Sequence, residues 1–241
     1  MKRHFFITGT SSGIGHALVR HILAEDIGTV TGIARRAVDI HDDRYTHVQG
    51  DLSDPAFVNG WQFEVPTETT HVYLVNNAGT IGDIHRQGEA DPEAIAQLFY
   101  LNLTSPAILI NRFIGSVPSD KQGIILNISS GAAQYAIDAW APYCGSKAGL
   151  DHFSRVVATE LSITQKDVRI FSVAPGIVDT EMQGVIRASD PNQFSRHGDF
   201  VSMKHSGELV SSETVAQRLA HVLTHPDAYL ETVFSLRDIS E

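Results

Sequence analysis

The sequence has little cysteine, no cluster of basic residues and no long hydrophobic run at its start. Cys144 is the only cysteine among 241 residues, which excludes an intramolecular disulfide. The net charge is −10 and Lys and Arg do not cluster, which argues against a nucleic-acid-binding groove. The apolar stretch Phe5–Ile7 is too short for a signal peptide or a membrane span. We therefore expect a cytoplasmic protein with no nucleic-acid or membrane partner.

The histidines do not form a convincing metal-binding pattern. His221 and His225 are one helical turn apart, but no acidic or cysteine partner is nearby in sequence and Pro226 follows directly. We interpret them as the end of a surface helix and expect no metal site. Cys144 follows Tyr143, but no base can be assigned to it, so a small packing residue is the simpler interpretation.

Strand-like and helix-like segments alternate along the whole chain. The expected strands are short and mostly apolar, as in a sheet covered on both faces, and are Phe5–Thr8, Thr29–Ala34, His47–Gln49, Val72–Val75, Gly123–Ile128, Val168–Val173 and an edge strand at Thr232–Leu236. The segments with helical spacing are Gly13–Ala24, Pro92–Ile114, Tyr143–Ser162 and Ser211–Leu223. This alternation predicts an α/β fold with a doubly wound parallel sheet of about seven strands and helices on both faces.

The composition fits one soluble domain over residues 1–241. Hydrophobic residues make up 42% and charged residues 19% of the chain, and we find no internal repeat, low-complexity segment or linker. One long irregular stretch covers about residues 181–209. Loops of this length are uncommon in a compact domain without a function, so we expect this stretch to be a lid over a site.

A glycine-rich turn lies between the first expected strand and the first expected helix. Its sequence, Thr8–Gly15, has the spacing Gly-x-x-x-Gly-x-Gly. Glycines allow the backbone to approach a pyrophosphate, which the N-terminus of the helix attracts. The alternative is a plain glycine-rich turn, but the position after an N-terminal strand favours a dinucleotide site formed by Gly9, Ser11, Ser12, Gly13, Ile14 and Gly15.

The end of the second expected strand has no acidic residue. An NAD site places Asp or Glu there to bind the ribose 2′-hydroxyl, whereas NADP requires a cation for its phosphate. The chain has Arg35 and Arg36 at this position, and guanidinium groups suit bidentate contacts to phosphate. Two solvated surface arginines are the alternative. We predict NADP(H), with Arg35 ahead of Arg36 as the ligand of the 2′-phosphate.

Tyr143 and Lys147 are four residues apart on an expected helix and therefore share one face. A cation near a phenol lowers its pKa from about 10 and tunes it for proton transfer. Ser130 lies at the end of an expected strand, thirteen residues before Tyr143. A Tyr-x-x-x-Lys pair alone is common on helix surfaces, but together with Ser130 and the glycine-rich turn it indicates catalysis.

In this order, the motifs resemble those of the short-chain dehydrogenase/reductase family, and the resemblance covers nearly the whole chain. The motifs are Thr8–Gly15, Asp51-Leu52, Asn76–Gly79, Asn102, Ser129-Ser130, Tyr143–Lys147 and Pro175–Thr180. The resemblance implies a Rossmann fold in which Ser130, Tyr143, Lys147 and Asn102 are catalytic. It also implies cofactor contacts from Asp51, Leu52, Asn77, Ala78, Gly79, Tyr143, Lys147, Pro175, Gly176, Ile177, Val178 and Thr180.

In the family, Tyr donates a proton to the carbonyl oxygen and Ser hydrogen-bonds the same oxygen. Lys depresses the pKa of the phenol and holds the nicotinamide ribose, and Asn anchors a water that links Lys to solvent. The family spacing selects Ser130, and we expect Ser129 to cap the strand end. The long helices Pro92–Ile114 and Tyr143–Ser162 pack across a two-fold axis in the family, so a homodimer or homotetramer is expected.

Further short segments resemble benzil reductases and sepiapterin reductases within the family. They are Ser130–Ala133, Ala139-Trp140, Tyr143-Cys144, Lys147–Asp151 and Gly176–Gln183. We therefore expect an NADPH-dependent reductase that acts on one carbonyl of an aromatic or vicinal diketone. The candidate pocket residues are Tyr135, Trp140, Met182, Ile186, Phe194 and Phe200, although several of them could instead pack the lid onto the core.

Two other functions are open from the sequence. The first is the same chemistry on a 3-oxoacyl, sugar or steroid substrate. The second is a nucleotide-sensing regulator that has the fold but performs no chemistry. A regulator would be expected to lack Ser130, Tyr143 or Lys147, and all three are present.

Overall fold

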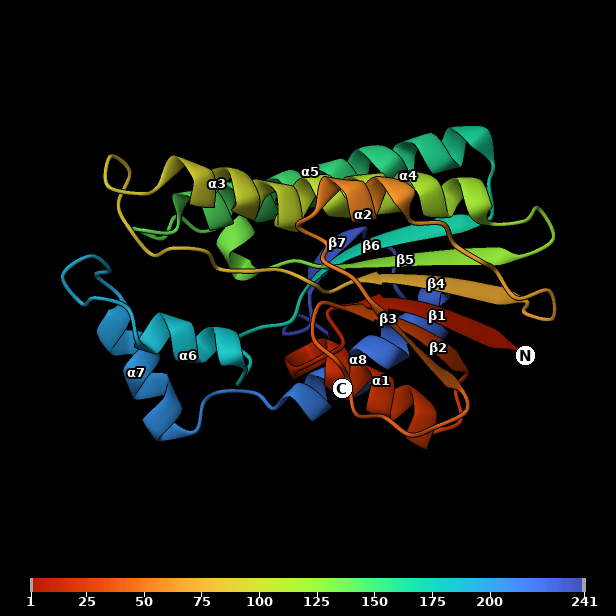
Figure 1. Cartoon of the computed structure of the whole chain (residues 1–241), viewed down its shortest axis with the longest axis horizontal. Coiled ribbons are helices and arrows are strands. Elements are labelled where there is room, and N and C mark those ends of the chain that lie inside the picture. Colours follow the sequence, from red (N-terminus) through yellow and green to blue (C-terminus); the bar gives the residue numbers. More distant parts are fainter. Residues whose placement is uncertain (1, 240–241) are drawn as a thin grey trace.

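The computed structural model describes residues 2–239 and contains a parallel sheet of seven strands between two layers of helices (Figure 1). The strands are β1 (Arg3–Thr8), β2 (Thr29–Ala34), β3 (Tyr45–Gln49), β4 (His71–Asn76), β5 (Gln122–Ile128), β6 (Val168–Ala174) and β7 (Val233–Ser235). Their order in the sheet is β3-β2-β1-β4-β5-β6-β7. The predicted doubly wound α/β fold is confirmed, with a strand at each predicted position.

The helices follow the predicted segments, with additions. They are α1 (Gly13–Ala24), α2 (Pro55–Gly60), α3 (Pro92–Phe99), α4 (Ser105–Ser116), α5 (Ala141–Thr164), α6 (Glu181–Arg187), α7 (His197–Ser206) and α8 (Ser212–Thr224). The short helix α2 was not predicted, although it has a clear start. Asp54 accepts a hydrogen bond from the backbone N–H of Ala56, and Pro55 occupies the first turn.

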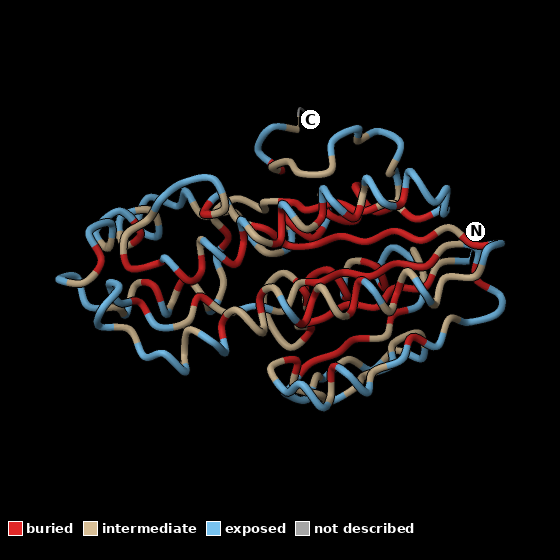
Figure 2. Tube along the Cα trace, turned by 90° about the horizontal axis from the view of Figure 1, so that it is seen from above, coloured by how far each residue is buried: buried red, intermediate tan, exposed pale blue. Residues whose placement is uncertain are grey.

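Each face of the sheet is covered by its own helices. Helices α1 and α8 pack together below the sheet in Figure 1, whereas α2, α4 and α5 lie above it. The strands between them are the most continuously buried part of the chain (Figure 2). Phe5 and Phe171 belong to the core under α1 and α8, and Phe6 and Phe113 belong to the core on the other face. This double burial explains why the strands are apolar on both faces rather than alternating.

The order of the strands reverses at β1, which pairs with β2 on one side and with β4 on the other. The chain therefore leaves β1 and β4 toward opposite faces of the sheet and opens a crevice at their carboxyl ends. Open α/β sheets bind their ligands at such a point. The glycine-rich turn follows β1, and the motif Asn76–Gly79 follows β4, so the fold brings both motifs to this crevice.

The predicted helix Pro92–Ile114 is one helical run with an interruption. A π-helical segment, Tyr100–Thr104, separates α3 from α4 and contains Asn102. The run Pro92–Ser116 is long and apolar enough, by length and composition alone, to cross a membrane, with a mean hydropathy of 1.2. Core helices of soluble proteins pass the same test, and α4 packs on β4 and β5.

The stretch 181–209 is not irregular as predicted, because it contains α6 and α7. Both helices lie at one end of the molecule, beyond the carboxyl ends of the strands (Figure 1). Phe200 is the buried residue of α7, and Ile186 and Gln183 are those of α6. With so few buried positions, neither helix shows the apolar repeat that helix prediction requires.

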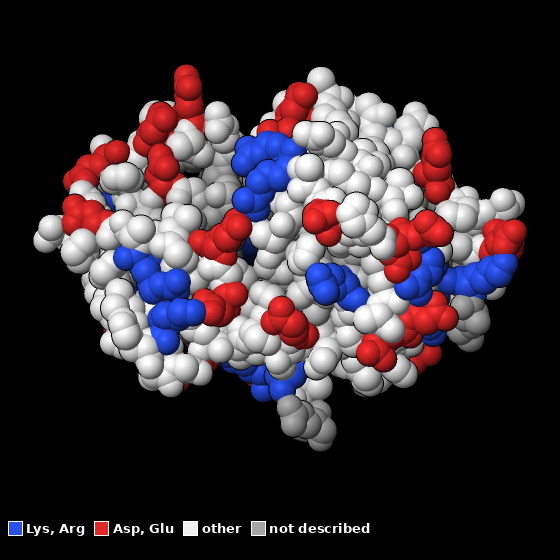
Figure 3. Space-filling view, turned by 60° about the horizontal axis from the view of Figure 1, so that its bottom comes forward, with Lys and Arg blue, Asp and Glu red and all other residues white. Residues whose placement is uncertain are grey.

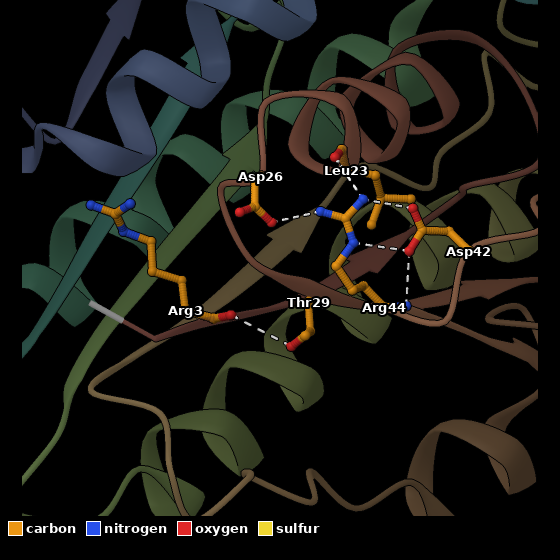
Figure 4. Close-up of polar contacts among 6 residues, drawn as sticks. All are labelled: Arg3, Leu23, Asp26, Thr29, Asp42 and Arg44. Atoms are coloured by element: carbon orange, nitrogen blue, oxygen red, sulfur yellow. Dashed lines mark hydrogen bonds and ion pairs between the residues drawn. The ribbon is translucent and has the colours of Figure 1, made fainter.

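Arg44 fastens the edge of the sheet that carries β3 to the end of α1 (Figure 4). Its guanidinium donates to the Asp42 carboxylate at 2.7 and 2.9 Å, to Asp26 at 2.7 Å and to the Leu23 carbonyl at 2.8 Å. Hydrogen bonds from Arg44 lower the pKa of Asp42 to about 2. Asp42 is therefore engaged by Arg44 at this edge of the sheet.

Candidate active site

The glycine-rich turn has the backbone geometry that a pyrophosphate cradle needs. Gly9 and Gly13 have positive φ angles of 72° and 56°, which other residues rarely adopt. A Cβ at Gly15 would lie 2.4 Å from the Gly9 carbonyl oxygen, so no larger residue fits there. Gly15 is buried and does not line the cavity, so its role is close packing rather than ligand contact.

Thr8 and Asn77 hold this turn against the end of β4. The Thr8 hydroxyl accepts hydrogen bonds from the backbone N–H groups of Asn77 and Ala78, at 2.9 and 3.0 Å. The Asn77 amide donates to the carbonyls of Thr8 and Gly9. These bonds join two predicted cofactor motifs into one surface. This role of Thr8 was not predicted, because its contacts with Asn77 and Ala78 depend on the pairing of β1 with β4.

Arg35 and Arg36 both line the cavity, but they occupy different places. Arg36 donates hydrogen bonds to the hydroxyls of Ser11 and Ser12 and pairs with Glu181 of α6 at 3.0 Å. Arg35 is 76% exposed, and its guanidinium is 3.6 Å from the carboxylate of Asp51. Arg36 therefore lies at the glycine-rich turn, and Arg35 lies beside Asp51, a predicted cofactor residue.

Two hydrogen bonds from Ser53 fix Asp51, one from its backbone N–H at 2.9 Å and one from its hydroxyl at 2.6 Å. Burial raises the pKa of Asp51, but these hydrogen bonds and Arg35 outweigh burial and leave the pKa below its usual value. Asp51 and Leu52 line the cavity together. Ser53 is a further residue of this corner that the sequence analysis did not assign.

Asn102 lies behind the cavity wall and is 1% exposed. Its side chain accepts from the backbone N–H of Thr80 at 2.9 Å and donates to the Thr80 carbonyl at 2.8 Å. It also donates to the Ser146 hydroxyl at 3.3 Å. Asn102 thus ties the loop after β4 to the helix that carries Tyr143 and Lys147. Its position in a π-helical segment fits the frequent use of such segments at functional sites.

Ser130 and Ser129 follow β5 and differ in their surroundings. Ser130 lines the cavity, and its hydroxyl accepts from the backbone N–H of Ala132 at 3.2 Å. The Ser129 backbone N–H donates to the Val173 carbonyl at 2.9 Å and extends the pairing with β6. Its hydroxyl is buried with no hydrogen-bond partner in residues 2–239, so it does not cap the strand end as expected.

Tyr143 and Lys147 lie on one face of α5 beside Ser130. The Lys147 ammonium is 5.9 Å from the centre of the Tyr143 ring and donates to the Ile128 carbonyl at 2.7 Å. Burial raises the pKa of the Tyr143 phenol, and a hydrogen bond with Ser130 opposes it. Burial also lowers the pKa of Lys147 to about 8, which Asp151 opposes. The predicted lowering of the phenol pKa by Lys147 is therefore wrong for this structure, because burial dominates.

The segment Pro175–Thr180 lies across the crevice from the glycine-rich turn. Gly176 has a φ of 87°, and a Cβ built on Gly13 would lie 3.3 Å from the Thr180 side chain. The predicted cofactor residues of this segment all line the cavity, namely Pro175, Gly176, Ile177, Val178 and Thr180. The two motifs, far apart in sequence, therefore form facing walls.

Five of the six candidate pocket residues line the cavity, but they differ in exposure. Trp140 is buried, with its ring edge-on to Tyr143 and stacked on Phe194 at 5.3 Å between ring centres. Met182 is partly buried, and Tyr135 is 68% exposed at the cavity mouth. Phe194, a further candidate, is fully buried behind Trp140 and does not line the cavity. It packs the lid onto the core, as the alternative interpretation proposed.

Polar contacts hold the lid segment in addition to the aromatic stack. The Asp138 carboxylate accepts from the Ser195 hydroxyl at 2.7 Å and from its backbone N–H at 3.1 Å. Arg86, from the loop after β4, donates to Asp138 at 3.4 Å. Ala139, which joins Asp138 to Trp140, has a φ of 63°, an uncommon value for a non-glycine residue. No local sequence pattern indicates this arrangement, because its members are far apart in the chain.

One cavity of about 1550 Å³ connects these groups, from Arg35 and the glycine-rich turn to Ser130, Tyr143 and the lid. On the face shown in Figure 3, a hollow with Lys and Arg side chains along it separates the part with the lid helices from the main body. The positive φ of Gly9 and Gly13 and the close approach of Thr180 fit a bound dinucleotide at one end of the cavity. Ser130, Tyr143 and Lys147 line the same cavity.

Comparisons with known proteins agree with this geometry. A model of the short chain dehydrogenase family matches residues 3–191. Benzil reductase ((S)-benzoin forming) of Bacillus subtilis is 34% identical over 230 residues, which covers 91% of this chain and 92% of the relative. Sepiapterin reductase of Xenopus tropicalis is 33% identical over 160 residues, covering 65% of this chain and 59% of the relative.

Solved structures show the same fold. A short-chain dehydrogenase/reductase from Saccharomyces cerevisiae superposes with a TM-score of 0.84 at 27% identity, covering 99% of this chain and 97% of that chain. The KRED1-Pglu enzyme superposes with a TM-score of 0.80 at 26% identity, covering 92% and 95%. The fold binds a nicotinamide cofactor, and oxidoreduction of CH–OH and C=O groups is typical of its members. The chain belongs to the short-chain dehydrogenase/reductase family of oxidoreductases.

Proposed function

We propose that this protein is an NADPH-dependent carbonyl reductase that reduces one carbonyl of an aromatic or vicinal diketone. The observation that carries the proposal is the placement of Ser130, Tyr143 and Lys147 together at the wall of one large cavity, next to Trp140 and the lid. The chemistry requires a proton donor and a hydrogen-bond donor at the same carbonyl oxygen, and Tyr143 and Ser130 provide them.

The coenzyme supplies a hydride to the carbonyl carbon, and the residues of the chain manage the oxygen. Tyr143 donates its phenolic proton to the oxygen as negative charge builds there. The Ser130 hydroxyl donates a hydrogen bond to the same oxygen, an interaction typically worth about 3 kcal/mol in the transition state. Lys147 holds the ribose of the coenzyme and places a positive charge beside the phenol. Asn102 fixes the loop after β4 in its place behind them.

Two observations support NADPH rather than NADH. The strand end at β2 provides arginines where an NAD site provides an acid. Arg35 is exposed and next to Asp51, at the adenosine end of the site, and can reach a phosphate on the ribose. Arg36 is already engaged by Ser12 and Glu181. We therefore keep Arg35 as the main ligand of the 2′-phosphate, with Arg36 nearer the pyrophosphate.

The cavity wall near Tyr143 supports an aromatic substrate. Trp140, Ile186 and Phe200 form an apolar surface, and Met182 adds a flexible side chain at its edge. Ring-bearing ligands bind such surfaces. The Bacillus subtilis relative, 34% identical over 230 residues, carries the name benzil reductase. A flat diketone held there would present one carbonyl to Ser130 and Tyr143, and its second carbonyl would lie away from the hydride.

We propose the following roles for the domain, the lid and the subunit contact. Residues 1–241 form one dinucleotide-binding domain, with residues 181–209 as a lid that excludes water from the reacting carbonyl. The helical run from α3 through α4, together with α5, forms the contact of a homodimer or homotetramer. The site of action is the cytoplasm.

A substrate panel tests the function. Benzil, 1-phenyl-1,2-propanedione, short aliphatic ketones, a 3-oxoacyl thioester and a keto steroid are each assayed with NADPH and with NADH, and the products are separated on a chiral column. We expect the aromatic diketones with NADPH to give the highest kcat/KM and one dominant hydroxyketone enantiomer. Better turnover of aliphatic ketones, or a racemic product, would contradict the aromatic pocket. Preference for the thioester or the steroid would favour the alternative substrates of the family.

A further inference from the structure

Asp151 is a buried carboxylate that the mechanism above does not use. It is 5% exposed and lies on α5, four residues after Lys147, so both side chains are on the same face of the helix. Lys147 is also 5% exposed. A buried carboxylate is costly unless a nearby cation or hydrogen bonds compensate for it. Its position therefore needs a physical reason.

Ser172 of β6 provides a hydrogen bond that partly compensates for the burial of the Asp151 carboxylate. Its hydroxyl is fully buried and donates a hydrogen bond of 2.7 Å to the Asp151 carboxylate. The bond joins the middle of α5 to β6 and holds the carboxylate by one of its oxygens.

Within residues 2–239, the contacts given for Lys147 with other elements are to neutral groups. Its ammonium donates to the carbonyl of Ile128 on β5, and a Cβ built on Gly79 would lie 3.7 Å from it. The π-helical segment presents the Asn102 amide to the same place. Carbonyl and amide groups solvate an ammonium but do not neutralise its charge.

The elements that pack against α5 also carry charged and titratable side chains. Helix α3 carries Glu93, which is exposed in its first turn, and β6 carries Arg169, which pairs with Asp227. The π-helical segment adds the phenol of Tyr100, whose pKa burial raises. For Lys147, burial lowers the pKa to about 8 and Asp151 is the group that acts in the opposite direction.

We propose that Asp151 is a positioning residue for the reduction: anchored by Ser172, it keeps the Lys147 ammonium charged at the end of β5, beside Tyr143. This inference rests on the proposed role of Lys147. Without the carboxylate, the charged amine would be buried among neutral groups, and its proton would be lost at a lower pH. The protein would then lose the cation beside the phenol within the range in which it works.

The first test measures the proton on Lys147 directly and needs no substrate. The protein is labelled with ¹³Cε-lysine, and the Lys147 resonance, assigned from Lys147→Arg, is titrated by NMR. We expect a midpoint near 8 in the wild type. Asp151→Asn preserves the shape and can still accept from Ser172, and it should lower the midpoint by about one unit. Asp151→Glu should restore most of the shift. An unchanged or higher midpoint in Asp151→Asn would overturn the proposal.

Two further variants separate charge from structure. Glu160→Gln removes a carboxylate from an exposed position on the same helix, and it should leave the Lys147 midpoint unchanged. Ser172→Ala keeps the Asp151 charge but removes its anchor, and a smaller lowering is expected. If Glu160→Gln shifts the midpoint as far as Asp151→Asn does, the effect is not local and the proposal fails. If Ser172→Ala leaves the Lys147 midpoint unchanged, the proposed anchoring role of Ser172 is wrong.

The second test is the pH profile of kcat for benzil reduction at saturating NADPH. We expect the rate of Asp151→Asn to fall at high pH earlier than that of the wild type, by the same shift as the NMR midpoint. A variant with lower kcat but an unshifted profile would show a structural effect only, which contradicts the proposal. If the wild type reduces no ketone, the proposed function fails, whereas the NMR titration still decides the role of Asp151.

Discussion

Burial controls both titratable residues of the candidate site. It raises the pKa of the Tyr143 phenol and so keeps its proton in place at neutral pH. The same burial lowers the pKa of Lys147 to about 8. The phenol is therefore a proton donor rather than a phenolate at rest, which suits the direction of carbonyl reduction. The hydrogen bond with Ser130 is the interaction that opposes burial and eases loss of the proton.

Tyr143→Phe should lower kcat about 10³-fold and leave the affinity for the coenzyme nearly unchanged. The ring stays packed against Trp140, and only the transferable proton is removed. Lys147→Ala should damage both kcat and coenzyme affinity, because it affects the proton chemistry and the ribose contact. Steady-state kinetics and a fluorescence titration with NADPH measure the two effects. A tenth of wild-type activity in Tyr143→Phe would show that the phenol is not the proton donor.

Coenzyme choice should depend more on Arg35 than on Arg36. Arg35→Ala should reduce the preference for NADPH over NADH, because it removes the exposed guanidinium beside Asp51. Arg36→Ala should weaken both coenzymes to a similar extent, because Arg36 lies at the glycine-rich turn with Ser11 and Ser12. The KM values of both coenzymes for the two variants decide between them. A wild type that binds NADH more tightly would contradict this assignment.

Individual residues could be predicted where a motif fixes their position on a strand end or a helix face. Ser130, Tyr143 and Lys147 meet because β5 ends and α5 begins where their spacing indicated. The place of Phe194 could not be predicted, because its burial depends on how the lid folds back on Trp140. The direction of the phenol pKa shift was also out of reach, since it follows from burial rather than from sequence distance.

At the level of the elements, a buried histidine joins β1 to β2. His4 is 7% exposed, and its ring nitrogens are 2.7 Å from the Thr29 hydroxyl and 3.1 Å from the Thr31 hydroxyl. Burial lowers the pKa of His4 from 6.5 to about 4. The unfolded chain therefore binds a proton at a pH where the folded chain does not. Stability from this group is complete above pH 6.5 and is lost as the pH falls toward 4.

The His4→Gln variant should lose less unfolding free energy in mild acid than the wild type does. A shift of this size corresponds to about 3 kcal/mol between pH 7 and 4, and the wild type should lose that much more than the variant over this range. Urea unfolding at a series of pH values measures the difference. His41→Gln is the matched control, because His41 is 94% exposed on its side chain and should not change the slope. Parallel curves for the wild type and His4→Gln would contradict the argument.

Some helices and strands could be predicted from the sequence with accurate bounds, and others could not. The strands β2 and β5 are short, mostly apolar runs, so their extents could be predicted within a residue. Helix α1 starts at the glycine turn and was predicted with its exact bounds. Helices α6 and α7 were missed, because each buries only one or two residues and has no apolar repeat. Their helical form depends on packing against Trp140, which no local pattern records.

At the level of the whole molecule, the chain should assemble through the outer faces of α4 and α5. Helix α5 exposes the apolar side chains of Val156 by 44% and Ile163 by 75%. A symmetric contact would bury the same patch on both subunits. We expect light scattering of the wild type at micromolar concentration to give about two or four times the mass of 26.3 kDa.

Val156→Arg should shift the measured mass toward the single-chain mass, because two opposed guanidinium groups would meet near the axis. Val185→Arg, an equally drastic change at an exposed position on α6, should leave the mass unchanged. A wild type that scatters as 26.3 kDa, or a Val156→Arg variant of unchanged mass, would show that this face is not the subunit contact.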